Sequence, residues 1–286
     1  MTPPDKTSGD DYLGLLDRLS DRLPRAAIAL RKAAETRHDH LRDLLEGARL
    51  AGVNDLLHYL DRTAEYYDAN EHLAKISFLV RRLIADFETA LEATLSGYVG
   101  VATDAMRDVL EVEYLLFDFA IDPSHIDTWL AGSDFNKFLP RVLRERLRKA
   151  GVAEFSSSVM ENADYKAHSA TLHVSPREAV IGQKGRASDS LEMDVGFWEI
   201  FEHAKRVLLA LEACGLTLAG PEWTEHATHP RPSLTRVADA HSRTQEMQSM
   251  YLAMLTGADL LKEQLGREPT TSELLRYVRD QLGSEG

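Results

Sequence analysis

The stretch Gly100–Asp122 (GVATDAMRDVLEVEYLLFDFAID) indicates the fold class of this chain. When the stretch is placed on a helix at about 100° per residue, its apolar and polar side chains separate onto opposite sides. The apolar side holds Ala105, Val109, Val112, Leu116 and Ala120. The polar side holds Asp104, Arg107, Asp108, Glu111 and Asp118. This separation predicts a core helix with one polar face.

One residue of the stretch breaks this pattern, because Glu113 falls inside the apolar arc. A lone buried carboxylate is costly unless it is neutral, paired or hydrogen-bonded. In one interpretation, Glu113 lies at a boundary between helices and meets an Arg or a Tyr. In the other, it is a carboxylate with a raised pKa in a pocket. Arg107, Glu111 and Tyr114 form a polar pattern beside it on one side of the helix.

The chain before this stretch is also predicted to be helical. Tyr12–Leu23 is amphipathic, and Ala26–Leu50 is rich in good helix formers and is expected to end near Gly52. Asn54 is the predicted N-cap of the helix that follows. Leu73–Leu95 repeats apolar residues at a seven-residue spacing, which is typical of packed bundle helices.

Helical patterns also follow the stretch. A short helix containing Trp129, a helix within Phe135–Ala150 and a helix from Asp189 to about Cys214 are expected. Val237–Leu265 shows a heptad-like pattern, and a capping box at Thr270 opens a terminal helix. Long loops are expected at 174–188 and 216–232. Because no stretch shows convincing strand alternation, the predicted class is all-α, a multi-helix bundle with long antiparallel helices.

The 286 residues are divided on these patterns into four parts. These are a disordered tail at 1–10, N-terminal helices at 11–69 that pack on the core, a central helical bundle at 70–217, and C-terminal helices at 218–286 that belong to the same domain.

The composition places the chain among soluble proteins, with 44% hydrophobic and 28% charged residues. No apolar run is long enough to span a bilayer, so no membrane association is expected. The start, MTPPDKTSGDD, lacks the apolar segment of a secretory signal. The single cysteine, Cys214, excludes an intrachain disulfide. Together these features predict a cytoplasmic protein.

Charge is strongly and unevenly distributed along the chain. The net charge of −13 argues against broad, non-specific binding of nucleic acid, because phosphates are repelled at long range. Residues 104–122 carry six acids against Arg107, whereas residues 137–149 carry six bases against Glu145. We expect these two segments to face each other as packed, complementary helices.

Site candidates come from spacing, because no nucleotide-binding, zinc-finger or HExxH motif is present and no metal or cofactor is expected. Tyr165, Ser169 and His173 lie four residues apart, stacked on one face of a predicted helix. Such a row can bind a phosphate or hydrogen-bond an Arg–Glu pair. Equally, it can be a polar network that locks two helices together.

These motifs carry a family resemblance over about Leu73–Pro176. The pattern Arg107-x3-Glu111, then Trp129, then Tyr165-x3-Ser169-x3-His173 and Pro176 resembles a family of uncharacterised all-helical bacterial proteins. That family is similar to the HEPN superfamily of helical bundles, which includes metal-independent ribonucleases of toxin and phage-defence systems. The resemblance implies a shared polar site made of Arg107, Glu111, Tyr165, Ser169 and His173.

HEPN nucleases also need an Arg and a His four to six residues apart, with a polar residue after the Arg. Here the spacing occurs at Arg236-x4-His241, where Val237 replaces the polar residue. An Arg that holds the scissile phosphate and a His for acid–base work are chemically suited to cleavage of RNA.

Two functions are therefore expected from different classes. The first is a non-catalytic helical binding or regulatory protein of bacterial stress or phage defence, which recognises a protein partner or a small anionic ligand. The alternative is a HEPN-like metal-independent ribonuclease, the case in which RNA is a partner. The acidic balance and the imperfect Arg236–His241 motif favour the first. In both cases a homodimer is expected, paired through Val237–Leu265.

Overall fold

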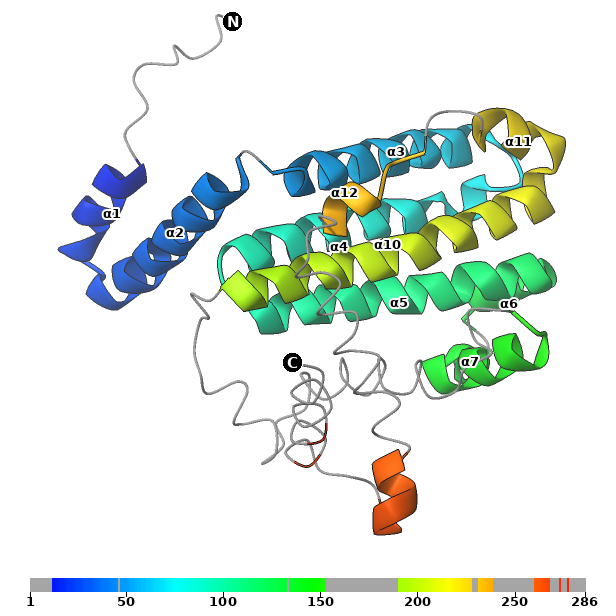
Figure 1. Ribbon diagram of the computed structural model, residues 1–286. Helices are drawn as coiled ribbons and strands as arrows, with labels where there is room; N and C mark the ends of the chain where they lie inside the picture. Colours follow the sequence, from blue (N-terminus) through cyan, green and yellow to red (C-terminus); the bar gives the residue numbers. More distant parts are fainter. Residues whose placement is uncertain are drawn as a thin grey trace, which may run out of the picture.

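The structure of the protein, a computed structural model, describes residues 12–45, 47–132, 134–152, 190–227, 231–238 and 260–267, with residues 273 and 277 (Figure 1). Across these ranges the chain forms helices joined by turns, and they contain no strand. The predicted all-α class is confirmed. None of the helices in these ranges is long and apolar enough to cross a membrane.

Four long helices lie side by side and form the body of the molecule (Figure 1). They are α3 (Arg49–Ala69), α4 (Ser77–Leu95), α5 (Val99–Ile121) and α10 (Ser190–Ala219). α5 packs against both α4 and α10, and α4 also contacts α3 and α10. A tight turn joins α4 to α5, with Gly97 at φ +73°, a conformation that glycine adopts without steric cost. The two helices therefore run antiparallel.

The predicted core helix is α5, which starts and ends one residue before the predicted stretch Gly100–Asp122. On its predicted apolar side, Val109 and Leu116 are fully inaccessible to solvent. Burying a side chain of this size contributes roughly 1.5–3 kcal/mol before the loss of conformational entropy. The hydrophobic pattern of this stretch therefore located the centre of the fold correctly.

The N-terminal helices α1 (Tyr12–Ser20) and α2 (Pro24–Leu44) form a hairpin at one end of the bundle (Figure 1). Pro24 opens α2, a position that suits its fixed φ and missing N–H. α2 meets the end of α4 through two polar contacts. His40 Nδ1 lies 2.9 Å from the carbonyl oxygen of Leu95, and Arg37 Nη1 lies 2.5 Å from Glu92 Oε1.

The boundary predicted near Gly52 is wrong. α2 ends at Leu44, α3 begins at Arg49, and both Gly52 and the predicted N-cap Asn54 lie inside α3. The glycine serves a different purpose, because α12 (Thr235–Ala238) crosses α3 at this point. A Cβ atom at Gly52 would lie 2.6 Å from the backbone nitrogen of Val237. The glycine thus allows two backbones to approach, and does not end a helix.

After α5 the chain folds back on itself through α6 (Ser124–Leu130), the 3-10 turn η2 (Phe135–Phe138) and α7 (Pro140–Lys149). The predicted short helix containing Trp129 is confirmed as α6. α7 packs on α5, and its Leu143 and Leu147 are buried in the core cluster. A second 3-10 turn, η1 (Ala74–Ile76), leads into α4.

The loop predicted at 216–232 is helical over most of its described length. α10 extends to Ala219, and α11 (Pro221–Ala227) follows after Gly220. Packing of one side chain explains this helix. Trp223 is fully buried, and a Cβ atom at Gly215 of α10 would lie 2.2 Å from its ring. Pro221 begins α11, a position that suits its fixed φ and missing N–H.

Several predicted elements lie outside the described residues. They are the helix with Tyr165, Ser169 and His173, the loop at 174–188 and the capping box at Thr270. Of the heptad-like segment Val237–Leu265, the structure describes 237–238 and 260–265.

Candidate functional site

The polar side of α5 forms a half-buried stripe along the bundle. We call it the polar face of α5, and it consists of Asp104, Arg107, Asp108, Glu111 and Asp118. The first four are partly exposed, while Asp118 is buried under α6 and α7. Residues between them, such as Met106, Val109 and Leu110, are buried on the other sides of the helix. Polar atoms along this face therefore meet both solvent and neighbouring helices.

The first half of the face joins α5 to α4. Arg107 Nη2 lies 3.5 Å from Glu111 Oε1, one helical turn away, and the two side chains are 23% and 40% exposed. From α4, Arg82 Nη2 donates a 2.6 Å hydrogen bond to Asp108 Oδ2. Its Nε lies 3.7 Å from Asp86 Oδ2. The structure thus brings Arg107 and Glu111 together as the sequence predicted, and adds Arg82 and Asp86.

Two carboxyl groups of this cluster hold their protons unusually tightly. Burial, together with the neighbouring charge of Asp108, raises the pKa of Asp86 from 3.8 to about 6, while Arg82 opposes the shift. Burial also raises the pKa of Glu111, and here Arg107 opposes the shift. Carboxyl groups with perturbed pKa values mark positions where binding of a further charge is coupled to a proton.

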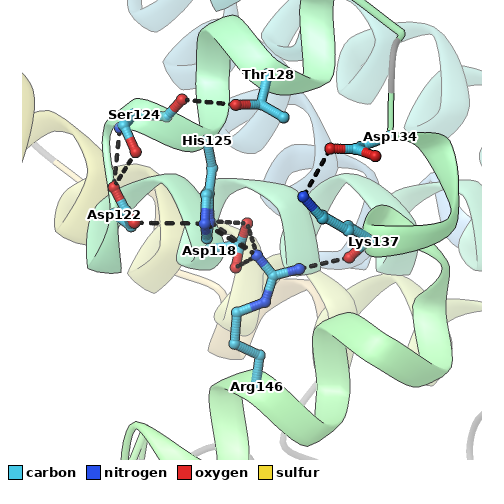
Figure 2. A network of polar contacts seen from close by, with 8 residues as sticks. All are labelled: Asp118, Asp122, Ser124, His125, Thr128, Asp134, Lys137 and Arg146. Carbon is cyan, nitrogen blue, oxygen red and sulfur yellow. Dashed lines mark hydrogen bonds and ion pairs between the residues drawn. The ribbon is translucent and has the colours of Figure 1, made fainter.

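The second half of the face lies under α6 and α7, around the fully buried carboxylate of Asp118 (Figure 2). His125 Nδ1 of α6 lies 2.9 Å from Asp118 Oδ2, and Arg146 Nη1 of α7 lies 3.1 Å from Asp118 Oδ1. Arg146 Nη2 also donates a hydrogen bond of 2.5 Å to the carbonyl oxygen of Lys137. One carboxylate therefore ties α6, η2 and α7 to α5.

Charged neighbours contact both ring nitrogens of His125. Its Nδ1 lies 2.9 Å from Asp118 Oδ2 and 2.8 Å from Arg146 Nη1. Its Nε2 lies 3.3 Å from Asp122 Oδ2. An Asp–His pair can transfer protons. Here both ring nitrogens are engaged, so the network acts as a clamp.

Burial raises the pKa of Asp118, and the charges of Arg146 and His125 oppose this effect. Removing Arg146 would therefore leave a carboxyl group with little compensation for its lost hydration. The Asp118–Arg146 pair therefore holds α7 against α5.

Glu113 lies at a helix boundary and meets an arginine, as the first interpretation stated. Its Oε2 is 3.2 Å from Arg206 Nε of α10. Arg206 Nη2 lies 2.9 Å from His203 Nδ1, and His203 Nε2 lies 3.5 Å from Glu199 Oε2. These contacts form a row of polar side chains from Glu113 in the core to the partly exposed Glu199. The Glu113–Arg206 pair links α5 to α10.

Four residues of these ion pairs, Arg49, Arg82, Asp86 and Asp194, are not among the residues predicted from the sequence. Arg49 and Asp194 form an ion pair of 2.5 Å between α3 and α10, with both side chains at least nine-tenths buried, and Arg49 also lies over the ring of Phe197. The signal for Arg82 and Asp86 was present, because residues four apart share a helix face. Arg49–Asp194 has a separation of 145 residues, and no local pattern could indicate it.

The predicted pairing of the acidic segment 104–122 with the basic segment 137–149 is found in part. α7 packs on α5, and Arg146 reaches Asp118. By contrast, Arg148 and Lys149 pair with Glu145 in their own helix. The two segments are therefore neighbours that pack through apolar side chains, with an ion pair between Arg146 and the buried Asp118.

The other predicted site residues are only partly described. Arg236 lies on α12, where its Nη1 is 2.8 Å from Asp55 Oδ2 of α3. Tyr165, Ser169, His173 and His241 lie outside the described residues, so their convergence with Arg107 stays a prediction.

In the described part of the chain, no group of three or more His, Cys, Asp or Glu side chains is arranged to hold a metal ion. Burial raises the pKa of the Cys214 thiol to about 12, which suits an inert core residue. Comparison with known proteins found no matching family model, curated protein or solved structure. The resemblance to the HEPN superfamily accordingly stays a prediction.

Proposed function

We propose that the protein is a non-catalytic helical binding protein that recognises an anionic group on the polar face of α5, beside Arg107. The observation that supports this is the half-buried Arg107, which faces Glu111, a carboxyl group whose pKa burial has raised. A guanidinium group is well suited to bind carboxylate or phosphate oxygens. In this proposal an incoming anion shares Arg107 with Glu111.

The raised pKa of Glu111 gives this binding a distinctive pH dependence. A second negative charge beside Glu111 would raise its pKa further, because like charges disfavour ionisation. Glu111 would then take up a proton as the anion binds. By linkage, affinity for the anion should increase as the pH falls toward the raised pKa of Glu111.

Ion pairs elsewhere on the face hold α5 against its neighbours. Arg82 of α4 pairs with Asp108, and Arg146 of α7 pairs with Asp118. A regulatory role in bacterial stress or phage defence belongs to the same proposal and rests on the family resemblance alone.

Titration calorimetry at several pH values with sulfate, whose charge does not change in the neutral and mildly acidic range, tests the proposal. We expect sulfate to bind more tightly at the lower pH with uptake of a proton, and Arg107→Ala to abolish binding. Arg81→Ala is the matched control, because Arg81 is an exposed arginine of α4 that pairs with Asp68 away from Glu111. Unchanged sulfate binding in Arg107→Ala would refute the site.

The ribonuclease alternative requires Arg236 and His241 to act together on a phosphate. Arg236 is engaged with Asp55 at 2.8 Å, and His241 lies outside the described residues. This alternative therefore stays a prediction. Its test is cleavage of total RNA by the wild type, lost in Arg236→Ala and in His241→Ala while both variants remain folded.

A further inference from the structure

α7 presents an unusually basic surface in an acidic protein. Residues 137–149 hold six bases and one acid in a chain of net charge −13. α7 packs on α5 through Leu143 and Leu147, which are buried. Arg141 and Arg148, seven residues apart, lie on the opposite side of the helix, where both are exposed. The packing of α7 thus leaves its arginine row facing outward.

The charges of α7 are only partly compensated within the helix. Arg146 points inward to Asp118. Arg148 and Lys149, which are 49% and 71% exposed, share the single carboxylate of Glu145. The hydrogen bond from Arg148 lowers the pKa of Glu145, and Lys149 adds to the effect, so Glu145 is ionised. Arg141, Arg148 and Lys149 together still exceed this one acid.

We propose that the outward face of α7, formed by Arg141, Arg148 and Lys149, docks an acidic helical segment of a partner protein. An α-helix rises about 1.5 Å per residue, so Arg141 and Arg148 are about 10 Å apart along the axis. Carboxylates seven residues apart on a second helix have the same separation. A helix lying along α7 can therefore meet both arginines at once.

The same kind of contact already holds this bundle together. Arg146 of α7 reaches a carboxylate of α5, and Arg206 of α10 reaches Glu113 of α5. Arginine–carboxylate pairs between adjacent helices are thus compatible with the helix spacing of this fold. The docking face is separate from the anion site beside Arg107, and the two proposals do not depend on each other.

Overall charge favours a short acidic segment over larger polyanions. A chain of net charge −13 repels nucleic acid at long range. A short segment with a few carboxylates carries less negative charge than a polyanion, so the acidic protein repels it less. If its carboxylates lie on one helix face, all of them can contact α7. The preferred partner is therefore a helix whose acids lie on one side.

The test uses two labelled, alanine-rich helical peptides of roughly 20 residues, a length at which isolated helices become stable. One carries Glu at i, i+3, i+7 and i+10 on one face, and the other has the same composition with Glu spread around the helix. Fluorescence anisotropy at about 50 mM salt measures binding to the full chain. We expect the patterned peptide to bind at least ~10-fold more tightly.

Substitutions on α7 should change this affinity in both directions. The double variant Arg141→Glu, Arg148→Glu should abolish binding of the patterned peptide, and Glu145→Gln should strengthen it because Arg148 and Lys149 lose their internal partner. The double variant Lys75→Glu, Arg81→Glu, at exposed bases of η1 and α4, makes the same change of net charge and should have little effect. Arg107→Ala should also leave peptide binding intact, which separates this proposal from the anion site.

Four results would overturn the proposal. The first is that neither peptide binds. The second is that both peptides bind equally, which would reduce the effect to net charge. A single-stranded RNA of equal charge binds more tightly and loses binding in the double variant, which would assign the face to nucleic acid. Finally, sedimentation shows self-association that the double variant removes, which would assign the face to a second copy.

Discussion

At the scale of single residues, the buried ionisable groups set the strongest constraints on this fold. Glu113 is almost completely buried and depends on Arg206 for compensation. Asp118 depends in the same way on Arg146 and His125. Each carboxylate would be expensive in an apolar core without its partner. These pairs specify which helix faces meet, because another alignment would leave a charge unpaired.

Replacing Arg206 with alanine should destabilise the fold by ~3 kcal/mol, because the Glu113 carboxylate would stay buried without its partner. Urea unfolding measures this loss. The same substitution in a Glu113→Gln background should cost less, since no buried charge is then left behind. Arg81→Ala, which breaks an exposed ion pair with Asp68, should change stability by less than about 0.5 kcal/mol. Equal losses in both backgrounds would contradict the explanation.

Asp86 should make stability fall as the pH rises through its folded-state pKa. Its pKa is raised from 3.8 to about 6, so the folded state holds a proton that the unfolded state has already released. Below about pH 4, Asp86 therefore costs the folded state almost no free energy. The full cost of ionising the buried carboxyl group applies above about pH 6. Relative to wild type, Asp86→Asn should gain about 2 kcal/mol of stability between pH 4 and pH 7.

Asp68 is the matched control for this pH dependence, with the opposite sign. Hydrogen bonds from Ser77 and then Arg81 lower its pKa. Its contribution to stability is therefore present above the unfolded pKa and is lost as the pH falls. Unfolding at several pH values should show Asp68→Asn converging with wild type in acid. The same trend in both variants would argue against burial as the cause at Asp86.

At the scale of elements, close backbone approach decides where short helices attach. α12 is four residues long and holds to α3 through the fully buried Val237 and the Arg236–Asp55 pair. The missing side chain at Gly52 lets the two backbones come together. A helix this short has no stability of its own, so its position depends on these contacts.

Substituting Gly52 with alanine should displace α12 from α3. The added Cβ would meet backbone atoms of residues 236 and 237 at 2.6–2.9 Å, and backbone cannot rotate away as a side chain can. We expect a net loss of roughly 1–2 kcal/mol, measured by thermal unfolding, with faster hydrogen exchange at 235–238.

Gly100→Ala provides the comparison for this prediction. Gly100 lies in the first turn of α5, and a Cβ there would meet no heavy atom within 4 Å. Alanine should therefore stabilise the helix by up to about 1 kcal/mol. If Gly52→Ala were equally stabilising, the close approach of α12 would not be what selects glycine.

At the scale of the whole molecule, the arrangement of α12 limits where a second copy can attach. The heptad-like pattern begins at Val237, but this residue is fully buried against α3 within the subunit. Leu265, at the other end, is exposed. A dimer interface formed by this segment must therefore start after Val237.

We expect the full chain to sediment as a dimer at tens of micromolar, because a heptad-like apolar face is stabilised by burial against a second copy. Met247→Glu with Met254→Glu, seven residues apart in the heptad-like pattern, should shift the protein to a monomer without loss of helical circular dichroism. Val237→Ala should weaken folding before it affects association. A wild type that is monomeric at these concentrations would exclude this interface.

The sequence by itself determined the fold class, the extent of the core helix and its polar face. Helix propensity and the 3.6-residue period depend on neighbours three and four residues apart, so a single segment contains that information. The same period showed that Glu113 is anomalous and that Arg107 and Glu111 meet.

Only the tertiary structure decided which residues complete each site. Arg206 for Glu113, Arg146 and His125 for Asp118, and the crossing of α12 at Gly52 all join segments distant in the chain. Which faces meet depends on how helices pack at particular angles and distances, and on the total free energy of the core. That choice is collective, so no local pattern in the sequence contains it.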